Sequence, residues 1–305
     1  MKAAVIDLGT NTFHLIIAEL SASGIAVIYK TNVPVRLGQG RINDHIIIPE
    51  AFDRGIQTLK DFRAEIDKHG VQIVRAIATS AVRSAINGQE FVDAARTAGI
   101  EIEVINGDLE AEYIFNGVKA SGVIEGVSLI MDIGGGSTEF VICNDEKLIW
   151  KKSYNIGAAR LMQANFKTDP ISADDRNAIL SHVANELTDL KEACLWHRPS
   201  RLIGSAGAFE TFATLLINDF DLQHAVSEQL DLQAYQKLSE QLISSTHEER
   251  KQLKGLIPLR VDMIVVAALL TNYIIKTMEL STLHLSAYDL KMGVLEIIRR
   301  DNFTN

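Results

Sequence analysis

The chain has 305 residues, a formal net charge of -9, a pI near 5.4 and 47% hydrophobic residues. This composition excludes intrinsic disorder, which needs low hydrophobicity together with high net charge. The acidic balance argues against a nucleic-acid partner, because such proteins carry a basic surplus that neutralises phosphates. A core tends to stop growing near roughly 250–300 residues, so the length predicts two domains.

Cysteine content and hydropathy bear on where the protein works. Cys143 and Cys194 give neither a disulfide framework nor a metal-cluster spacing, which favours a reducing compartment. The N-terminus lacks the long apolar region of a signal peptide. The longest apolar run, Ile264 to Leu270, is too short to span a bilayer. We therefore expect a cytoplasmic protein with no membrane contact, in which this run forms a buried helix.

The first part of the chain begins with a predicted hairpin. An apolar run from Ala3 ends at Asp7-Leu8-Gly9-Thr10-Asn11-Thr12, and a second apolar run follows. The periodicity then predicts strands at 25–29, 73–78 and 100–105, and helices at 50–69, 89–98 and 108–120.

The same architecture recurs from Ser128. A hairpin is predicted around Asp132-Ile133-Gly134-Gly135-Gly136-Ser137-Thr138-Glu139. Strands follow at 147–154, 202–204 and 282–285, and helices at 173–196, 208–217, 231–245, 261–278 and 289–299. Each half alternates in the order β-β-β-α-β-α-β-α, which predicts a mixed sheet flanked by helices. We expect two similar α/β domains, 1–121 and 122–305, with a cleft between them of the kind that often binds ligands.

The two matched turns carry the chemistry. Gly9 and the three glycines Gly134, Gly135 and Gly136 allow a close approach of the backbone to an anion, and successive N–H groups form anion-binding nests. Hydroxyls of Thr10, Thr12, Ser137 and Thr138 add neutral donors. One such turn would equally suit a plain hairpin, whereas two copies at matched points predict a phosphate site.

The aspartate of each turn needs a different explanation. Asp7 and Asp132 cannot bind phosphate directly, because two anions repel one another. A divalent cation such as Mg²⁺, bridging carboxylate and phosphate, resolves this conflict. Asp7 and Asp132 are therefore candidate metal ligands.

Together these turns resemble the two phosphate motifs of the exopolyphosphatase / guanosine pentaphosphate phosphohydrolase family. Further similar segments lie along nearly the whole chain, at Val35–Gly40, Ala78–Asn87, Ile105–Ala111, Ile156–Leu161 and Arg260–Asp262. The resemblance implies an actin-like ATPase fold of duplicated ribonuclease-H-like domains, each with a five-stranded mixed sheet. It also implies hydrolysis of terminal phosphoanhydride bonds.

The resemblance also implies roles for matched residues. Glu110 is implied to activate the attacking water, and Asp132 with the catalytic residue Glu139 to hold Mg²⁺ or another divalent cation. Phosphate binding is implied for Asn11, Thr12, Arg83 and the loop from Gly134 to Thr138. Arg36, Arg160, Arg260 and Lys291 are expected to be structural or surface residues.

Three positions depart from the family pattern. Glu112 stands where the family has Arg, Gly204-Ser205-Ala206-Gly207-Ala208 replaces a Gly-Thr-Gly-Gly-Thr turn, and Leu290-Lys291-Met292-Gly293 replaces Leu-Arg-x-Gly. The first departure puts the grip on substrate in question. The direction of any shift in the pKa of Glu110 stays open, because nearby phosphate would raise it while a metal and Arg83 would lower it.

The expected substrate is inorganic polyphosphate, with guanosine pentaphosphate (pppGpp) as the closest alternative. A superfamily kinase remains a further alternative, because its third glycine turn would correspond to Gly204–Gly207. A non-catalytic polyphosphate or alarmone sensor is another. A homodimer is the default expectation for the assembly.

Overall fold

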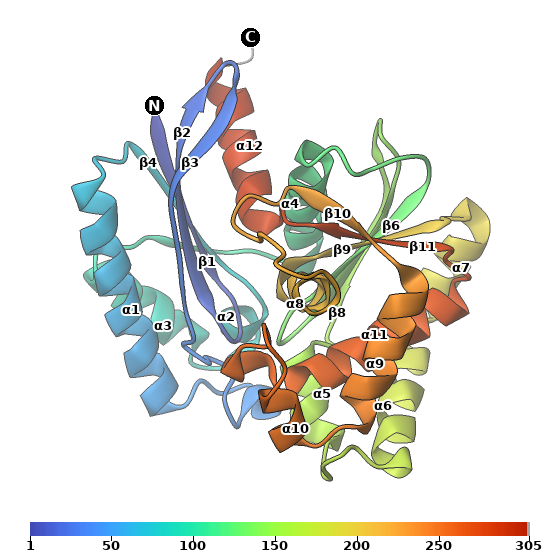
Figure 1. The fold of residues 1–305 in the computed structure, drawn as a ribbon. Helices are drawn as coiled ribbons and strands as arrows, with labels where there is room; N and C mark the ends of the chain where they lie inside the picture. Colours follow the sequence, from blue (N-terminus) through green and yellow to red (C-terminus); the bar gives the residue numbers. More distant parts are fainter. Residues whose placement is uncertain (304–305) are drawn as a thin grey trace. The chain divides into compact units, whose positions relative to one another are not determined.

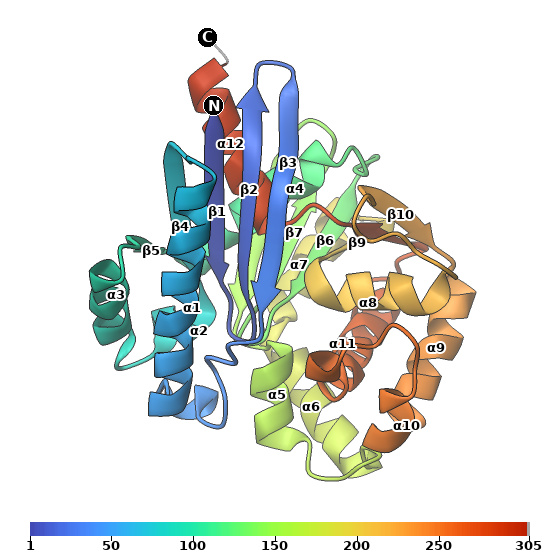
Figure 2. The ribbon, with the colours of Figure 1, turned by 60° about the vertical axis from the view of Figure 1, so that its left-hand side comes forward.

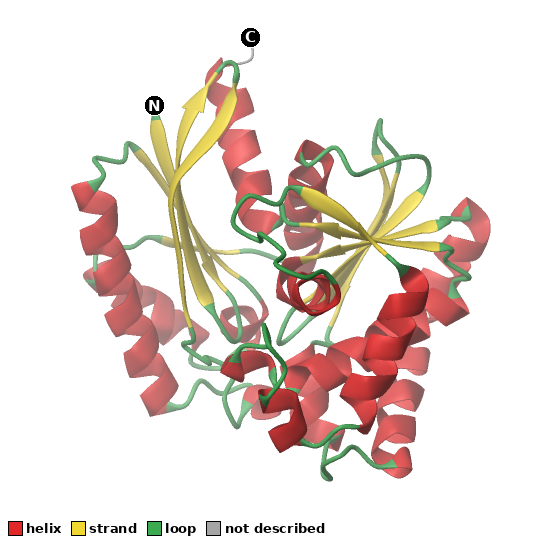
Figure 3. Ribbon diagram, in the orientation of Figure 1, coloured by secondary structure: helices red, strands yellow, loops and turns green. Residues whose placement is uncertain are grey.

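The computed structural model describes residues 1–303 of the chain, which divides into two compact units. Unit 1 contains Met1–Ala120 and the C-terminal helix α12 (Leu290–Phe303), and unit 2 contains Ser121–Asp289 (Figure 1). Each unit is built around its own β-sheet (Figure 3).

Unit 1 contains a five-stranded mixed sheet in the order β3-β2-β1-β4-β5. Its strands are β1 (Lys2–Leu8), β2 (Phe13–Ser21), β3 (Gly24–Val33), β4 (Ile73–Ala78) and β5 (Ile102–Val104). The first three form the predicted antiparallel meander, and β4 and β5 run parallel to β1. The predicted hairpin and the strand at 73–78 are confirmed.

Helices cover both faces of this sheet. They are α1 (Pro49–Lys68), α2 (Ser80–Ser84), α3 (Gly88–Thr97), α4 (Gly107–Ala120) and α12, with a short 3-10 turn η1 (Ile42–Asp44). Alternation along β1 places Ala4, Ile6 and Leu8 in a core with α1 and α3. The other face carries Asp7, and α12 lies against β1 and β2 there (Figure 2).

Unit 2 repeats this topology. Its strands are β6 (Ser128–Ile133), β7 (Thr138–Cys143), β8 (Leu148–Tyr154), β9 (Arg201–Ser205), β10 (Ser227–Leu230) and β11 (Thr282–Ser286). The order β8-β7-β6-β9-β11 matches β3-β2-β1-β4-β5 strand for strand, which confirms the duplicated ribonuclease-H-like fold. The prediction of five strands per sheet is wrong here, because β10 adds a sixth, antiparallel to β11. This edge strand has the sequence Ser-Glu-Gln-Leu, which carries no apolar alternation.

The helices of unit 2 are more numerous than those of unit 1. They are α5 (Ala158–Asn165), α6 (Ala173–Glu186), α7 (Thr188–His197), α8 (Ala206–Leu216), α9 (Leu232–Ser244), α10 (His247–Lys251), the 3-10 turn η2 (Pro258–Arg260) and α11 (Met263–Thr277). The single helix predicted over 173–196 is two helices. The break falls at Leu187, beside which the Thr188 hydroxyl donates to the Asn185 carbonyl and competes with the helical pattern.

Helix α11 is the predicted buried helix. The run from Ile264 to Leu270 is buried in the core of unit 2. Among residues 1–303, no helix has the length and apolarity that a membrane span requires.

The C-terminal helix α12 belongs to a different domain from the one predicted by the division at residue 122. That division assigned all of 122–305 to the second domain, whereas α12 packs on β1, β2 and α4 and belongs to unit 1. A Cβ atom on Gly293 would lie 1.8 Å from the carbonyl oxygen of Tyr113 in α4. Glycine therefore permits the close contact between the two helices.

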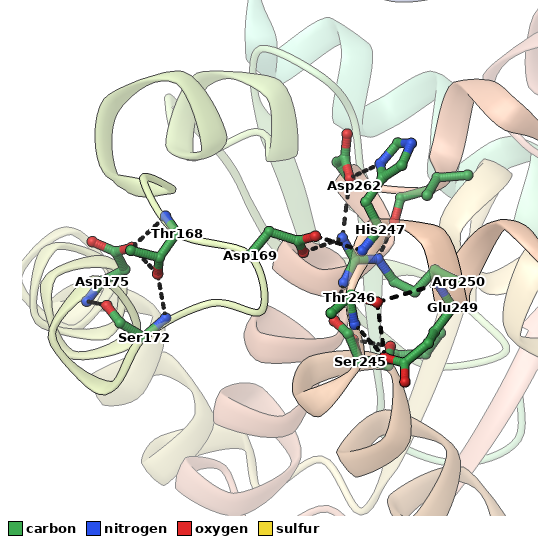
Figure 4. A network of polar contacts seen from close by, with 12 residues as sticks. Thr168, Asp169, Ser172, Asp175, Ser245, Thr246, His247, Glu249, Arg250 and Asp262 are labelled. Atoms are coloured by element: carbon green, nitrogen blue, oxygen red, sulfur yellow. Dashed lines mark hydrogen bonds and ion pairs between the residues drawn. The ribbon is translucent and has the colours of Figure 1, made fainter.

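A buried arginine ties together three segments of unit 2 (Figure 4). The Arg250 side chain is 0% exposed and donates to Asp169 and Asp262, each at 3.0 Å, and to the carbonyl of Val261. His247 contacts the same oxygen of Asp262 at 2.7 Å. A buried arginine is stable only when its donors are paired. Asp262, part of a segment matched to the family, thus has a structural partner.

Candidate active site

The turn after β1 is fixed from one side by the segment that follows β3. Arg36 N–H donates to the Asn11 carbonyl at 2.7 Å, and Gly38 N–H donates to the Thr10 carbonyl at 2.9 Å. The residues beside Arg36, Val35 and Leu37, are buried. The Arg-Leu-Gly segment therefore holds the first turn in shape, as expected of a structural segment.

Glu110 and Arg83 lie together in unit 1. Glu110, in the first turn of α4, is 6% exposed. Its Oε2 accepts a hydrogen bond of 2.9 Å from Nη1 of Arg83, and the same nitrogen donates to the carbonyl of Ile105. Arg83 comes from α2, just beyond the end of β4. The two residues are 27 positions apart in sequence, and β4 and β5 with their following helices bring them together.

Burial decides the direction in which the pKa of Glu110 moves. Desolvation raises the pKa of Glu110 from 4.5 to about 7, against the lowering effects of Arg83 and of a hydrogen bond with Thr79. The negative charge of Asp7 adds to the increase. A carboxyl group with a pKa near 7 is suited to exchange a proton at neutral pH.

Asp7 stands at the end of β1, directly opposite His14 in β2. Residues opposite one another in an antiparallel pair point to the same face of the sheet. On that face, Oδ2 of Asp7 lies 3.9 Å from Nζ of Lys291 in α12. Unit 1 thus gathers Asp7, Arg83, Glu110 and Lys291 around the end of β1.

The glycine turn of unit 2 is held by the start of α5. The carbonyls of Gly134, Gly135 and Gly136 accept hydrogen bonds from the N–H groups of Ala158, Arg160 and Gly157, respectively. Arg160 Nε donates a further hydrogen bond of 3.0 Å to Gly136. A Cβ atom on Gly157 would lie 2.5 Å from the backbone of Gly135 and Gly136, so this contact requires glycine.

These carbonyl contacts orient three peptide groups in one sense. In a trans peptide the N–H points opposite to the carbonyl of the preceding residue. The N–H groups of Gly135, Gly136 and Ser137 therefore point away from α5, and none donates to another group within residues 1–303. Successive amides aimed the same way form an anion-binding nest. Thr138 differs from its expected role as a donor to a ligand, because its hydroxyl donates to the Ile156 carbonyl at 3.1 Å.

Two carboxylates face each other beside this nest. Asp132 in β6 is directly opposite Glu139 in β7, and they are 7% and 2% exposed. Ser153 in β8 is opposite Glu139 and donates to it at 2.6 Å. Like charges directly opposite one another on neighbouring strands repel, and a cation close to both carboxylates would offset this repulsion.

The donor set fits a divalent cation of the magnesium type. Mg²⁺ is usually bound by one or two carboxylates, with waters and substrate phosphates as the remaining ligands, and Asp132 and Glu139 supply two carboxylates. In residues 1–303, no group of three or more His, Cys, Asp and Glu side chains is arranged to hold a metal ion. The metal assignment of Asp7, Asp132 and Glu139 stays a prediction.

The turn that would bind adenosine in a kinase has an internal partner. The Arg260 guanidinium donates to Thr211 at 2.7 Å and lies against Gly207, where a Cβ atom would be 2.1 Å from Nη2. Ala206 adopts a φ of 61°, a left-handed conformation that the family's glycine would adopt without strain. Arg260 therefore has the structural role expected of it.

Sequence reasoning missed some of these neighbours. Thr79 lies in the matched segment Ala78–Asn87 but was assigned no role of its own, and Ser153 carried no motif signal. Gly157 and Arg160 were matched to the family, but their contact with the glycine turn follows from the fold alone. Lys291 was expected to be a structural or surface residue, and its side chain is 15% exposed beside Asp7.

The chain is similar to known proteins over nearly its whole length. The model of the Ppx/GppA phosphatase family matches residues 16–298. A solved structure of an exopolyphosphatase from Cytophaga hutchinsonii is 39% identical, with a TM-score of 0.96, and covers 99% of this chain and 98% of that one.

Two curated relatives differ in length. The "Putative exopolyphosphatase" of Haemophilus influenzae is 26% identical over 302 residues, which are 98% of this chain and 92% of that protein. The guanosine-5'-triphosphate,3'-diphosphate pyrophosphatase of Pseudoalteromonas translucida is 29% identical over 296 residues. This alignment covers 96% of the present chain and 58% of the relative.

Proposed function

Because this chain belongs to the Ppx/GppA phosphatase family, whose members act on phosphoanhydride bonds, we propose that it is an exopolyphosphatase. It would release terminal phosphate from inorganic polyphosphate in a metal-dependent reaction. The alternative substrate within the same reaction class is pppGpp. Sequence identity favours the first, because it is 39% to the Cytophaga exopolyphosphatase and 29% to the Pseudoalteromonas pyrophosphatase.

The observation that carries the proposal is the environment of Glu110. Transfer of a phosphoryl group to water requires a residue that orients the water and accepts its proton. Glu110 is buried beside Arg83, and burial raises the pKa of Glu110 to about 7. At neutral pH a substantial fraction is ionised and able to accept that proton. A kinase would need to exclude water at this point, so a water-activating carboxylate favours hydrolysis.

Phosphate binding is assigned to both turns. The N–H groups of Gly135, Gly136 and Ser137 supply three donors of fixed direction, and fixed donors lower the cost of binding an anion because they need little rearrangement. Arg83 uses Nη1 for Glu110 and Ile105, which leaves its other terminal nitrogen to reach a phosphate oxygen. Thr10, Asn11 and Thr12 would contribute from the first turn.

Asp132 and Glu139 would hold the divalent cation. When bound, the cation would offset the negative charge that develops on the transferred phosphoryl group. Ser153 keeps Glu139 in place through its 2.6 Å hydrogen bond. These residues thereby combine charge neutralisation with a fixed orientation of the carboxylates.

The test is release of phosphate from polyphosphate in the presence of Mg²⁺, for the wild type and Glu110→Gln. We expect the variant to lose at least about 10²-fold in kcat, as is typical for removal of a general base. Glu112→Gln is the matched control, because Glu112 lies on the same helix with an exposed side chain. Equal rates for wild type and Glu110→Gln would remove Glu110 from the mechanism.

The substrate is identified by a panel of short polyphosphate, long polyphosphate, pppGpp and ATP under the same conditions. Preference for polyphosphate supports the proposed name, and preference for pppGpp supports the alternative. Absence of phosphate release from every member of the panel would contradict the hydrolase assignment for this chain. Tight binding without turnover would indicate the sensor.

A further inference from the structure

Lys291 lies in the first turn of α12, against the face of the unit 1 sheet that carries Asp7. Its side chain is 15% exposed, and that of Asp7 is 18% exposed. Lysine is rarely buried to this degree without an anionic partner. An apolar residue at position 291 would pack with a smaller desolvation cost. The positive charge of Lys291 therefore has a function at this position.

The packing of α12 fixes the position of Lys291 relative to Glu110. Gly293, two residues after Lys291, lies against the backbone of Tyr113 in α4. Glu110 is three residues before Tyr113, on the same side of that helix. One pair of helices, α4 and α12, thus holds both the carboxyl group assigned to water activation and the ammonium group of Lys291.

The contact between Lys291 and Asp7 is one of charge. Their closest atoms are 3.9 Å apart, which is beyond hydrogen-bond distance. By contrast, Arg83 binds Glu110 through a hydrogen bond of 2.9 Å. A lysine ammonium has three donors on a flexible four-carbon stem. Its attraction to Asp7 persists while it contacts a phosphate oxygen, because a Coulomb interaction falls only slowly with distance.

We propose that Lys291 is a further substrate-binding residue, whose ammonium contacts the terminal phosphate held by the Gly9–Thr12 turn. Asp7 is two residues before that turn and anchors the ammonium beside it. The inference rests on the proposed function, because it assumes a polyphosphate chain at this turn. It gives a binding role to Lys291, which was expected from the sequence to be a structural or surface residue.

The test is the binding of tripolyphosphate by calorimetry, with a chelator present and Glu110→Gln as the background, so that neither turnover nor metal contributes. Lys291→Met should raise Kd at least about tenfold, because removal of a charge-assisted contact costs about 1.5 kcal/mol or more. Lys291→Arg, which keeps the charge, should remain within about threefold. Lys60→Met is the control, since Lys60 is exposed on α1.

Two results would overturn the inference. One is an unchanged Kd in Lys291→Met, or in Lys291→Gln if the methionine variant does not fold. The other is recovery of tight binding when Asp7→Asn is added to Lys291→Met, because the lysine would then only neutralise Asp7. Failure of the proposed function is seen separately, as absence of phosphate release by a wild-type protein that still binds tripolyphosphate through Lys291.

Discussion

Burial of Glu110 gives the free energy of unfolding a pH dependence that the variant Glu110→Gln should lack. In the folded chain the pKa of Glu110 is about 7, whereas its ordinary value is 4.5. Between these two values the folded protein retains a proton that the unfolded chain has lost. Stability from this group is therefore fully present below pH 4.5 and is lost as the pH rises through 7.

The size of the effect follows from the shift. Each unit of pKa corresponds to about 1.36 kcal/mol, so a shift of about 2.5 units is worth about 3 kcal/mol. The side chain is only 8% exposed, and solvent screening does not reduce this figure greatly. Relative to the wild type, Glu110→Gln should gain most of this free energy between pH 5 and pH 8.

Urea unfolding at several pH values measures that difference, and Glu112→Gln should follow the wild type. Carbon-13 NMR of glutamate-labelled protein gives a direct reading, because one carboxyl resonance should titrate near pH 7 and be missing in Glu110→Gln. If wild type and variant keep a constant difference in free energy over this range, and no carboxyl titrates above pH 6, the argument from burial is refuted.

Three substitutions test the packing of the backbone around the site. Gly157→Ala puts a Cβ atom 2.5 Å from the backbone of Gly135. We expect phosphate release to slow at least about 10²-fold, which is the scale of losing an anion-binding donor. An unaltered rate would show that the turn can shift without loss of activity. Gly293→Ala puts a Cβ atom 1.8 Å from the carbonyl oxygen of Tyr113. This substitution should lower the free energy of unfolding by about 3 kcal/mol. An unchanged Tm would contradict the close contact of α4 and α12. Ala206→Gly relieves the backbone strain of a residue with a φ of 61°. It should raise the free energy of unfolding, measured in urea, by about 1 kcal/mol. A lower stability would show that the turn is unstrained.

The regular elements were predictable because their periodicity is local. The strand at 73–78 and the helix of α1 follow from apolar spacing and flanking glycine, and the matched hairpins made the duplication visible. Membership of α12 in unit 1 was not predictable, because a helix has no sequence mark that names the sheet on which it packs. The homodimer, the interdomain cleft and the cytoplasmic location stay predictions.

The sequence predicted which residues belong to the site better than it predicted their contacts and pKa values. Glu110 and Arg83 were identified from the family resemblance, and their hydrogen bond joins residues that no local pattern connects. The direction of the pKa shift depends on burial, which a sequence does not state. The role of Gly157 could be identified only from the fold, because a Cβ atom there would lie 2.5 Å from the backbone of Gly135, which is distant in sequence.

The return of the chain to unit 1 at Leu290 affects how the protein folds during synthesis. Domains generally fold as units as they emerge from the ribosome. Unit 2 lies wholly within Ser121–Asp289, so it is complete before α12 has been made. The first 120 residues emerge earlier, but the sheet face that carries Asp7 lacks its covering helix until α12 has been synthesised. The unit synthesised first is thus the last to finish folding, and premature termination before Leu290 would spare unit 2 and leave unit 1 with an uncovered apolar face.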